Sequence, residues 1–473
     1  MARIIVLGAG LCGLSTAMLL ARDGHEVTVL ERDPAEPPPA AEAEQAWDAW
    51  QRSGVNQFRL PNVMLPRWRV EMDRELPEVL HALEAVGGLR INVLSMLPAS
   101  QRGPWRDGDD RFETVTARRP VVEAALTGVV AATAGVTIRR GVAVTGLLTD
   151  SSVTGPVPRV TGVLAAGGLT LRAELVVDCA GRRSALTSWL RAVGARRPAE
   201  ERADCGFVYY ARHYQTRTGT LPEGHTNVLQ RHESMSILTL PADNGTWSVA
   251  LVTSGRDRAM RGLRDPARWD AALALYPLAA NWRDGEPSPA VDVIAGIEDR
   301  HRDLVVDGAP VATGVVAVGD AWACTNPSLG RGATIGLLHA IGLRDVLRDT
   351  DPGDHDKLVH RFHERTTTTV ERLYRATLWF DRHRLAELDA DAAGTPYQTD
   401  DPTWAFSLAM FAAGRTDPDI ARAYQSLSSL LATPDDLIAE PGLAEKIIRL
   451  GGDAPNYPLP GPRRGELLAA IDG

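Results

Sequence analysis

The chain is poor in lysine and cysteine. Of its 51 basic residues only Lys357 and Lys446 are lysines, so a reaction that needs an active-site lysine has two candidates. The four cysteines are far apart in the sequence and include no CxxC pair. This spacing argues against a disulfide framework and a zinc site, and it suits a reducing, cytoplasmic location.

The sequence also lacks a basic stripe and internal repeats. The net charge at pH 7 is −9, from 51 basic and 60 acidic residues, which makes nucleic acids and anionic membranes poor candidates as partners. The uncharged run from Ile4 to Ala21 contains three closely spaced glycines and follows a single arginine. These features argue against a signal peptide or a membrane span. A length of 473 residues with ordinary globular composition predicts two or three domains.

The first 32 residues predict a strand, a glycine turn, a helix and a second strand. The apolar run Ile4–Leu7 is too short for a helix and ends at the pattern Gly8-Ala9-Gly10-Leu11-Cys12-Gly13. Gly8 allows a tight turn, Gly10 leaves room for a pyrophosphate, and Gly13 lets the helix lie close to the strand. Free N–H groups at the helix start would hold the anion.

The second strand, Glu26–Leu30, is followed by Glu31. A carboxylate at this place accepts hydrogen bonds from an adenosine ribose and repels a 2′-phosphate, so we expect FAD or NAD rather than NADP. We expect the neighbouring Arg32 to contact the same nucleotide.

Two later stretches repeat the strand-to-turn pattern. The run 175–184 leads through Ala180-Gly181 into a predicted helix at 185–193, and a second backbone nest is expected there. The run 315–340 contains a buried strand, Gly319-Asp320 and a helix that starts near Gly330 to Gly332. Asp320 could accept hydrogen bonds from a ribityl chain, and the N–H groups of the turn could face a flavin ring. A capping Asp in an ordinary turn explains the pattern equally well.

The stretch 205–257 predicts antiparallel strands rich in aromatic residues and histidines, with a hairpin at Asp243-Asn244-Gly245. Such a sheet could roof a pocket for an organic substrate. Tyr210 and His213 are candidate catalytic residues, although ordinary sheet packing is the simpler interpretation of each.

The remaining chain adds helices and a few strands, and residues 351–473 carry no motif that we can interpret chemically. The expected elements are helices at 47–60, 71–86, from Pro120, 265–282, 404–431 and 464–471, and a β-meander over 135–177.

Three motifs together resemble the fingerprints of the FAD-dependent monooxygenases with the p-hydroxybenzoate hydroxylase fold. They are GAGLCG with Glu31, DCAGRRS, and GD followed by P(x2)GxG. The resemblance covers about the first 350 residues. Within that group GVNQFR at 54–59, Arg119-Pro120 and DCAGRRSALTSWLRAVG are most similar to bacterial polyether epoxidases and styrene monooxygenase.

The resemblance implies roles for single residues. Gly8, Gly10, Gly13 and Glu31 would bind the ADP half of FAD. Arg119, with Gln57 or Arg59, would bind the flavin nucleotide, and Asp320 would bind the ribityl chain. The other expected cofactor contacts are Gly181, Gly319, Pro327, Gly330 and Gly332. No metal is expected.

We therefore expect an α/β fold: a Rossmann-like FAD-binding domain, an interleaved antiparallel substrate sheet and C-terminal helices. The expected domains are 1–200 and 291–350 for FAD, with 55–110 partly near the substrate, 201–290 for the substrate sheet, and 351–473 as a helical region. The implied function is a monooxygenase of secondary metabolism that moves one oxygen atom from O₂, through a C4a-hydroperoxyflavin, to an organic molecule by epoxidation or hydroxylation.

Departures from the family pattern qualify this expectation. The hydroxylases' central Asp-Gly is Ala180-Gly181 here, so NAD(P)H is expected as electron source either directly or through a separate flavin reductase. The related halogenases need a lysine in the N-terminal half and a Trp-x-Trp-x-Ile-Pro motif, and this chain has neither. A dehydrogenase or reductase of the same fold and a noncatalytic flavoprotein are the alternatives.

Overall fold

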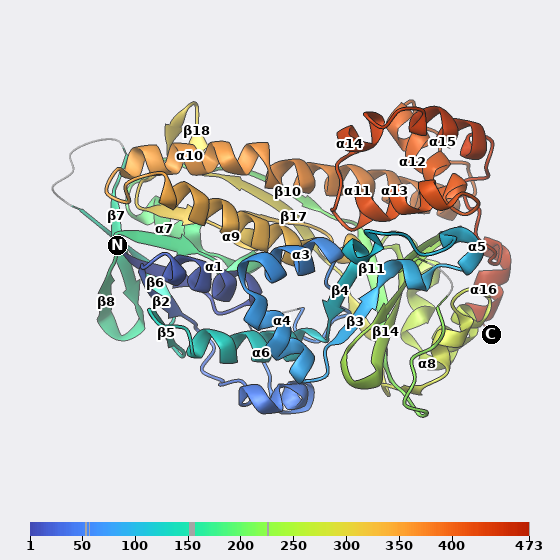
Figure 1. Ribbon diagram of the computed structural model, residues 1–473, viewed down its shortest axis with the longest axis horizontal. Coiled ribbons are helices and arrows are strands. Elements are labelled where there is room, and N and C mark those ends of the chain that lie inside the picture. The colour runs from blue at the N-terminus through green and yellow to red at the C-terminus, as the bar shows by residue number, and fades with distance from the viewer. Residues whose placement is uncertain (53, 56, 151–156, 225–226, 473) are drawn as a thin grey trace.

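A five-stranded parallel sheet gathers strands from distant parts of the chain. We describe a computed structural model that covers residues 1–52, 54–55, 57–150, 157–224 and 227–472 (Figure 1). The strand order is β20-β9-β1-β2-β5. The strands are β1 (Arg3–Leu7), β2 (Glu26–Leu30), β5 (Val136–Arg139), β9 (Leu175–Asp178) and β20 (Val315–Ala317). Both faces of β1 are buried, which explains its unbroken apolar sequence.

The amino-terminal unit has the predicted order of strand, turn, helix and strand. Helix α1 (Leu11–Arg22) starts directly after Gly10, and Gly24 follows it with a φ of +83°. The helix packs against α9 (Gly332–Arg348). The first and the last element of the FAD-type pattern are therefore neighbours in space.

An antiparallel sheet stands beside the parallel one, with order β12-β13-β14-β11-β15 and β16 paired to β11. Its strands are β11 (Phe207–Gln215), β12 (Leu229–His232), β13 (Met235–Pro241), β14 (Thr246–Ser254), β15 (Glu286–Pro287) and β16 (Asp292–Ile294). The predicted hairpin joins β13 to β14, with Asn244 and Gly245 at positive φ. One face packs on α8 (Pro266–Ala274) and α16 (Arg464–Asp472).

Two three-stranded sheets, one of them the ribbon β10-β17-β21, and two short strand pairs complete the described strands. The ribbon β10-β17-β21 follows the order of Ala199–Asp204, Glu298–Asp303 and Ala323–Cys324. The predicted meander is confirmed only for β6 (Val144–Thr149), β7 (Val160–Ala165) and β8 (Leu169–Arg172), because the outer strands β5 and β9 join the parallel sheet. The short pairs are β3 (Leu89–Asn92) with β4 (Glu113–Thr116), and β18 (Val305–Val306) with β19 (Ala309–Pro310).

Several helices are shorter than expected. The helix expected at 47–60 is only α2 (Ala46–Ala49); positions 53 and 56, the second within GVNQFR, lie outside the described residues. The helix expected at 71–86 is two helices, α3 (Pro66–Glu75) and α4 (Pro77–Ala85), since Leu76 precedes a proline and leaves the helical region. The remaining helices of this half are α5 (Ala99–Arg102), α6 (Arg119–Ala131), where Pro120 stands at the start as predicted, and α7 (Leu186–Ala192).

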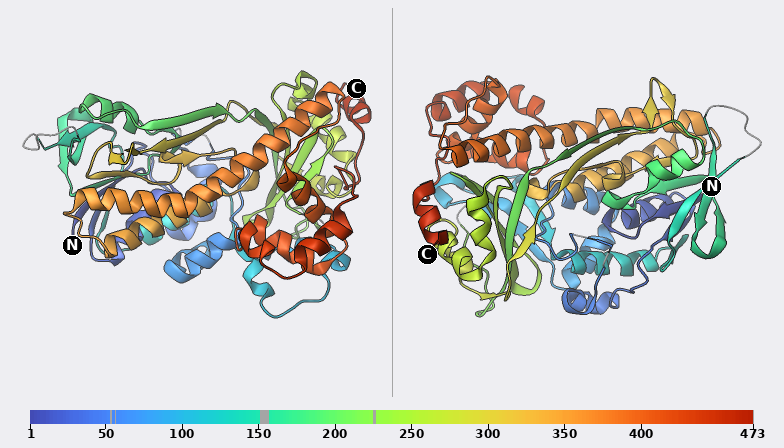
Figure 2. Two further views of the ribbon diagram at one scale, coloured as in Figure 1. Left: turned by 90° about the horizontal axis from the view of Figure 1, so that it is seen from above. Right: turned by 180° about the vertical axis from the view of Figure 1, so that it is seen from behind.

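The carboxyl-terminal third is helical, as expected. Its helices are α10 (His355–Thr368), α11 (Val370–Ala393), α12 (Pro402–Ala413), α13 (Pro418–Ser428), α14 (Pro434–Ile438) and α15 (Leu443–Gly451), followed by α16. Figure 2 shows α11 running from the parallel sheet to the antiparallel sheet, where α12 to α15 cluster. The predicted α/β class with a Rossmann-like sheet and C-terminal helices is confirmed. No helix within the described ranges is long and apolar enough to cross a membrane.

Candidate functional site

A cavity of about 1010 Å³ lies where the two sheets and the C-terminal helices meet. Its floor is formed at the carboxyl ends of β1, β9 and β20, by Gly10, Gly181 and Asp320. Ligands of open parallel sheets bind at this edge, because the strand-to-helix turns there present free N–H groups.

The first turn has the shape that a pyrophosphate needs. Gly8 has a φ of +97°, and a Cβ on it would lie 2.7 Å from the Cys179 carbonyl oxygen. A Cβ on Gly13 would lie 2.0 Å from the Gly8 carbonyl oxygen. By contrast, a Cβ on Gly10 would have no atom within 4 Å, and Gly10 lines the cavity. Gly8 and Gly13 are thus glycines for protein packing, whereas Gly10 keeps open a space that the protein does not fill.

Substitution of these glycines distinguishes a glycine that leaves room for a ligand from one that the packing of the protein requires. Gly10 has a φ of −91°, which any residue adopts. We predict that Gly10→Val folds within about 1 kcal/mol of wild type but no longer retains FAD. Gly13→Val should lose about 3 kcal/mol or more of unfolding free energy, since the side chain would meet backbone. Thermal melts and FAD titration by flavin fluorescence measure both effects. Tight FAD binding by Gly10→Val would remove the pyrophosphate assignment.

Side-chain hydrogen bonds stabilise the second turn, which follows β9. Buried Asp178 accepts hydrogen bonds from the Ala180 N–H at 2.9 Å and from the Ser184 hydroxyl. Arg302 in turn donates to Ser184 Oγ at 3.2 Å. Gly181 has a φ of +71° and open space beside it. This turn therefore also presents backbone to the cavity.

The return segment from β20 to α9 completes the floor. Gly319 has a φ of +63°, and its N–H donates to His339 Nδ1 at 3.2 Å. Burial lowers the pKa of His339 to about 3, so the ring stays neutral and can accept this bond. The Asp320 carboxylate lines the cavity and has no hydrogen-bond partner among the described residues, and burial raises its pKa. These free oxygens fit the hydroxyls of a ribityl chain.

Eight of the predicted cofactor residues line the one cavity. They are Gly10, Arg119, Gly181, Gly319, Asp320, Pro327, Gly330 and Gly332, and Gln57 joins them. Gly330 has a φ of +63°, and Gly332 has open space where α9 begins. The arrangement fits a dinucleotide flavin whose ring lies at the start of α9.

Glu31 lies in a buried ion network instead of facing the cavity. It accepts hydrogen bonds from the N–H groups of Ala9 and Asp33, each at 2.9 Å, and forms an ion pair with Arg52. Arg52 also pairs with Glu123, which accepts from Arg119 at 2.8 Å. Burial opposes ionisation of Glu123, but the two arginines outweigh it and hold its pKa below the usual value. Arg32 is exposed and donates to the Gly54 carbonyl oxygen at 3.1 Å.

Removal of Arg52 should be costly because Glu31 would remain buried without a cation and Glu123 would lose one of its two arginines. We predict that Arg52→Ala loses about 3–5 kcal/mol of unfolding free energy in urea denaturation. Arg32→Ala, at an exposed site of the same segment, should change it by less than about 0.5 kcal/mol. Equal effects of the two substitutions would contradict the network.

The remaining candidates lie outside the cavity lining. Arg59 donates to the Trp50 carbonyl oxygen at 3.2 Å, and its own carbonyl contacts His213 Nε2 at 3.0 Å. Burial lowers the pKa of His213 to about 4. Tyr210 belongs to the core between the antiparallel sheet and α8, and its carbonyl accepts from Trp269 Nε1 at 2.9 Å. Neither Tyr210 nor His213 lines the cavity, and their catalytic roles stay predictions.

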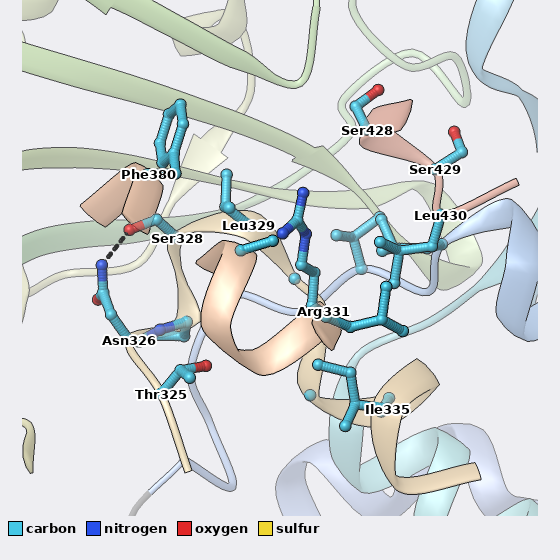
Figure 3. A pocket seen from close by; sticks show the side chains of 18 of the residues that line it. Thr325, Asn326, Ser328, Leu329, Arg331, Ile335, Phe380, Ser428, Ser429 and Leu430 are labelled. Atoms are coloured by element: carbon cyan, nitrogen blue, oxygen red, sulfur yellow. Dashed lines mark hydrogen bonds between the residues drawn. The ribbon is translucent and has the colours of Figure 1, made fainter. Parts of the chain in front are cut away.

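Tyr209 lies on the opposite face of β11 from Tyr210, and it lines the cavity. Its hydroxyl contacts Asn326 and lies 2.7 Å from Ser328 Oγ, and Asn326 Nδ2 donates to Asp381 Oδ1 at 3.1 Å. Figure 3 shows the Asn326–Ser328 contact beside the cavity. Burial, and next Asp299, raise the pKa of Asp381 to about 8, so its carboxyl is neutral at pH 7. Sequence reasoning missed this network, since it joins β11, the 326–328 turn and α11.

The Asp381 carboxyl makes stability depend on pH. Its folded pKa of about 8 lies above the unfolded value, so folding takes up a proton, and the stabilisation present below about pH 4 is lost as pH rises towards 8. We predict that the unfolding free energy of wild type falls more steeply between pH 5 and 8 than that of Asp381→Asn. The slopes should differ by up to ~1.4 kcal/mol per pH unit.

Urea denaturation at several pH values measures this difference. Asp435→Asn, which changes an exposed carboxyl at the cavity rim, should keep the wild-type profile. Parallel profiles for wild type and Asp381→Asn would show that Asp381 is ionised in the folded protein.

The roof of the cavity comes from the helical region that carried no motif. Apolar side chains line it from the sheet and from α11 to α13, with a few polar groups at 425–429. The apolar members are Leu238, Leu240, Ile294, Phe380, Met410, Phe411 and Leu430. Such a lining suits an organic molecule rather than a polar one.

Comparison with known proteins finds similar sequences and folds. Residues 3–41 match the family described as FAD dependent oxidoreductase. Protein Rv3254 of Mycobacterium tuberculosis (strain ATCC 25618 / H37Rv) is 29% identical over 398 residues, which are 77% of each chain.

Solved structures share most of this fold. PqsL of Pseudomonas aeruginosa, a probable FAD-dependent monooxygenase, superposes with a TM-score of 0.57 at 15% identity, over 83% of this chain and 98% of PqsL. The flavin-dependent halogenase CmlS gives a TM-score of 0.59 at 18% identity, over 92% of this chain and 78% of CmlS.

Fold and site define the class of protein: the chain has the architecture of the FAD-dependent monooxygenases and halogenases. Its amino-terminal segment is similar to that of FAD dependent oxidoreductases, and the rest of the chain shares the fold of these flavin-dependent proteins.

Proposed function

We propose that this protein is an FAD-dependent monooxygenase that transfers one oxygen atom from O₂ to a small organic molecule. The supporting observation is that the glycine turns that fit a flavin dinucleotide and an apolar space under α11 to α13 belong to the same cavity. A ring at the start of α9 would lie at the boundary between these two parts.

The residues of the floor hold and orient the cofactor in this proposal. Asp320 accepts hydrogen bonds from the ribityl chain, and Arg119 and Gln57 contact the nucleotide. The N–H groups that open α9 stabilise negative charge on the ring, because they lie at the positive end of a 17-residue helix. When bound, reduced FAD supplies the activation of O₂. The apolar roof excludes water from the oxygen-transfer step.

Halogenation is a less suitable reaction for this cavity. Neither lysine lines it: Lys446 pairs with Asp417 and Asp419, each at 2.8 Å, and Lys357 is exposed on α10. The likeness to CmlS therefore supports the fold and not the reaction. Epoxidation or hydroxylation as in the polyether epoxidase and styrene monooxygenase branch, a cytoplasmic location, and electrons from NAD(P)H directly or through a flavin reductase stay predictions.

Oxygen labelling tests the proposal. We predict that protein supplied with FAD, NADPH, a flavin reductase and ¹⁸O₂ gives a product one ¹⁸O atom heavier for an accepted substrate. Asp320→Ala should retain little FAD and form no product. Turnover under nitrogen would instead assign a dehydrogenase or reductase. Reoxidation in air without substrate-dependent labelling would favour a noncatalytic flavoprotein. Mass spectrometry of the product distinguishes these results.

A further inference from the structure

Arg331 is a partly buried cation that has no ion-pair partner among the described residues. Its side chain lines the cavity at the start of α9, and Nη1 donates to Thr377 Oγ1 of α11 at 3.1 Å. Its Nε is buried and has no hydrogen-bond partner in the described part of the chain, and no described carboxylate forms an ion pair with it. Burial lowers the pKa of Arg331 to about 10, so the guanidinium is still charged at pH 7.

Other arginines that line the cavity do have partners. Arg231 forms an ion pair with Glu387 at 2.6 Å, and Arg375 pairs with Glu371 at 3.1 Å. The acidic side chain with the largest electrostatic effect on Arg331 is that of Asp381, but the two form no ion pair, and Asp381 Oδ1 accepts a hydrogen bond from Asn326 Nδ2. Among the described residues, no carboxylate therefore lies in ion-pair contact with the Arg331 guanidinium.

The surroundings of Arg331 belong to the roof of the cavity and not to the cofactor floor. Thr377 lies on α11, and Tyr424, whose pKa responds to Arg331, lies on α13 and also lines the cavity. In the view of Figure 3 the guanidinium extends from the start of α9 into the region between Leu329 and Ser428–Leu430. An anion bound there would meet the guanidinium on one side and apolar side chains on the other.

A charge that is partly withdrawn from water and has no partner lowers the stability of the folded protein. A ligand that brings the opposite charge removes this cost, and the released free energy adds to its binding. A planar guanidinium also matches the two oxygens of a carboxylate in a bidentate pair. A neutral ligand would leave the cost in place.

We propose that Arg331 is the anion anchor of the substrate cavity, and that the organic molecule accepted here carries a carboxylate at one end of an apolar body. This inference rests on the proposed function and names its substrate class. Arg331 sets which molecules enter and how they lie relative to the floor.

Binding of a model anion tests the inference without turnover. The probes are benzoate and its neutral isostere benzamide, titrated by calorimetry into the FAD-saturated protein. We expect benzoate to bind at least tenfold more tightly than benzamide. Arg331→Gln should lose benzoate affinity by about 10- to 100-fold, and Arg331→Lys should retain part of it. Equal affinity for the two probes, or wild-type benzoate affinity in Arg331→Gln, would overturn the proposal.

Two controls separate this role from general charge and from folding. Arg372→Gln removes an exposed arginine at the rim of the same cavity and should change benzoate affinity by less than about threefold, because solvent screens that charge. Arg331→Gln without ligand should melt at or above the wild-type temperature, since it removes a cation that has no ion-pair partner among the described residues. A large loss of stability would assign Arg331 a structural role instead.

The outcome is independent of the oxygen-labelling result. Benzoate binding that depends on Arg331 in a protein that transfers no oxygen would keep the anion site and remove the monooxygenase proposal. Oxygen transfer to neutral substrates that does not depend on Arg331 would keep the monooxygenase proposal and remove the anion site.

Discussion

The architecture depends on the close approach of three backbone turns at one edge of the parallel sheet. Gly13 brings α1 to within contact of the Gly8 carbonyl, and Gly319 leaves the room that the Cys12 side chain occupies. These contacts fix the turn after β1 relative to the turns after β9 and β20. Because side chains are missing there, backbone N–H groups line the floor, and segments more than 300 residues apart in the sequence share one ligand space.

Two arginines, Arg52 and Arg331, differ in how the protein pairs their charge near this floor. Arg52 has carboxylates on two sides and joins the first strand-helix unit to α6. Arg331 has none in the described part of the chain and faces the cavity. The first arrangement is expected where a charge stabilises the fold, and the second where a charge is kept for a ligand at some cost in stability. The contrast between two similar side chains is the physical basis for assigning them different roles.

The sequence was sufficient to predict the backbone of the first turn that borders the cavity. Gly8, Gly10 and Gly13 follow a strand and precede a helix, and this local pattern determines the turn without help from the rest of the chain. The same holds for the hairpin at 243–245 and the helix start at Pro120.

The substrate half could not be predicted, because its residues meet only through tertiary packing. Alternation along β11 decides that Tyr209 and not Tyr210 faces the cavity, and the face that an aromatic strand presents cannot be chosen from its sequence. Asp381 and Tyr424 lie in helices with no recognisable motif. Glu31 was expected to face a ribose, but the buried ion pair with Arg52 depends on a residue 21 positions away.

The most direct test of the central claim is a crystal structure of the protein with FAD. The account predicts density for one extended dinucleotide, with its pyrophosphate against Gly10 and its flavin ring at Gly330 to Gly332, so that the far side of the ring faces the Arg331 guanidinium and the apolar roof. Density for the flavin elsewhere, or a ring that fills the space under α11 to α13, would contradict it.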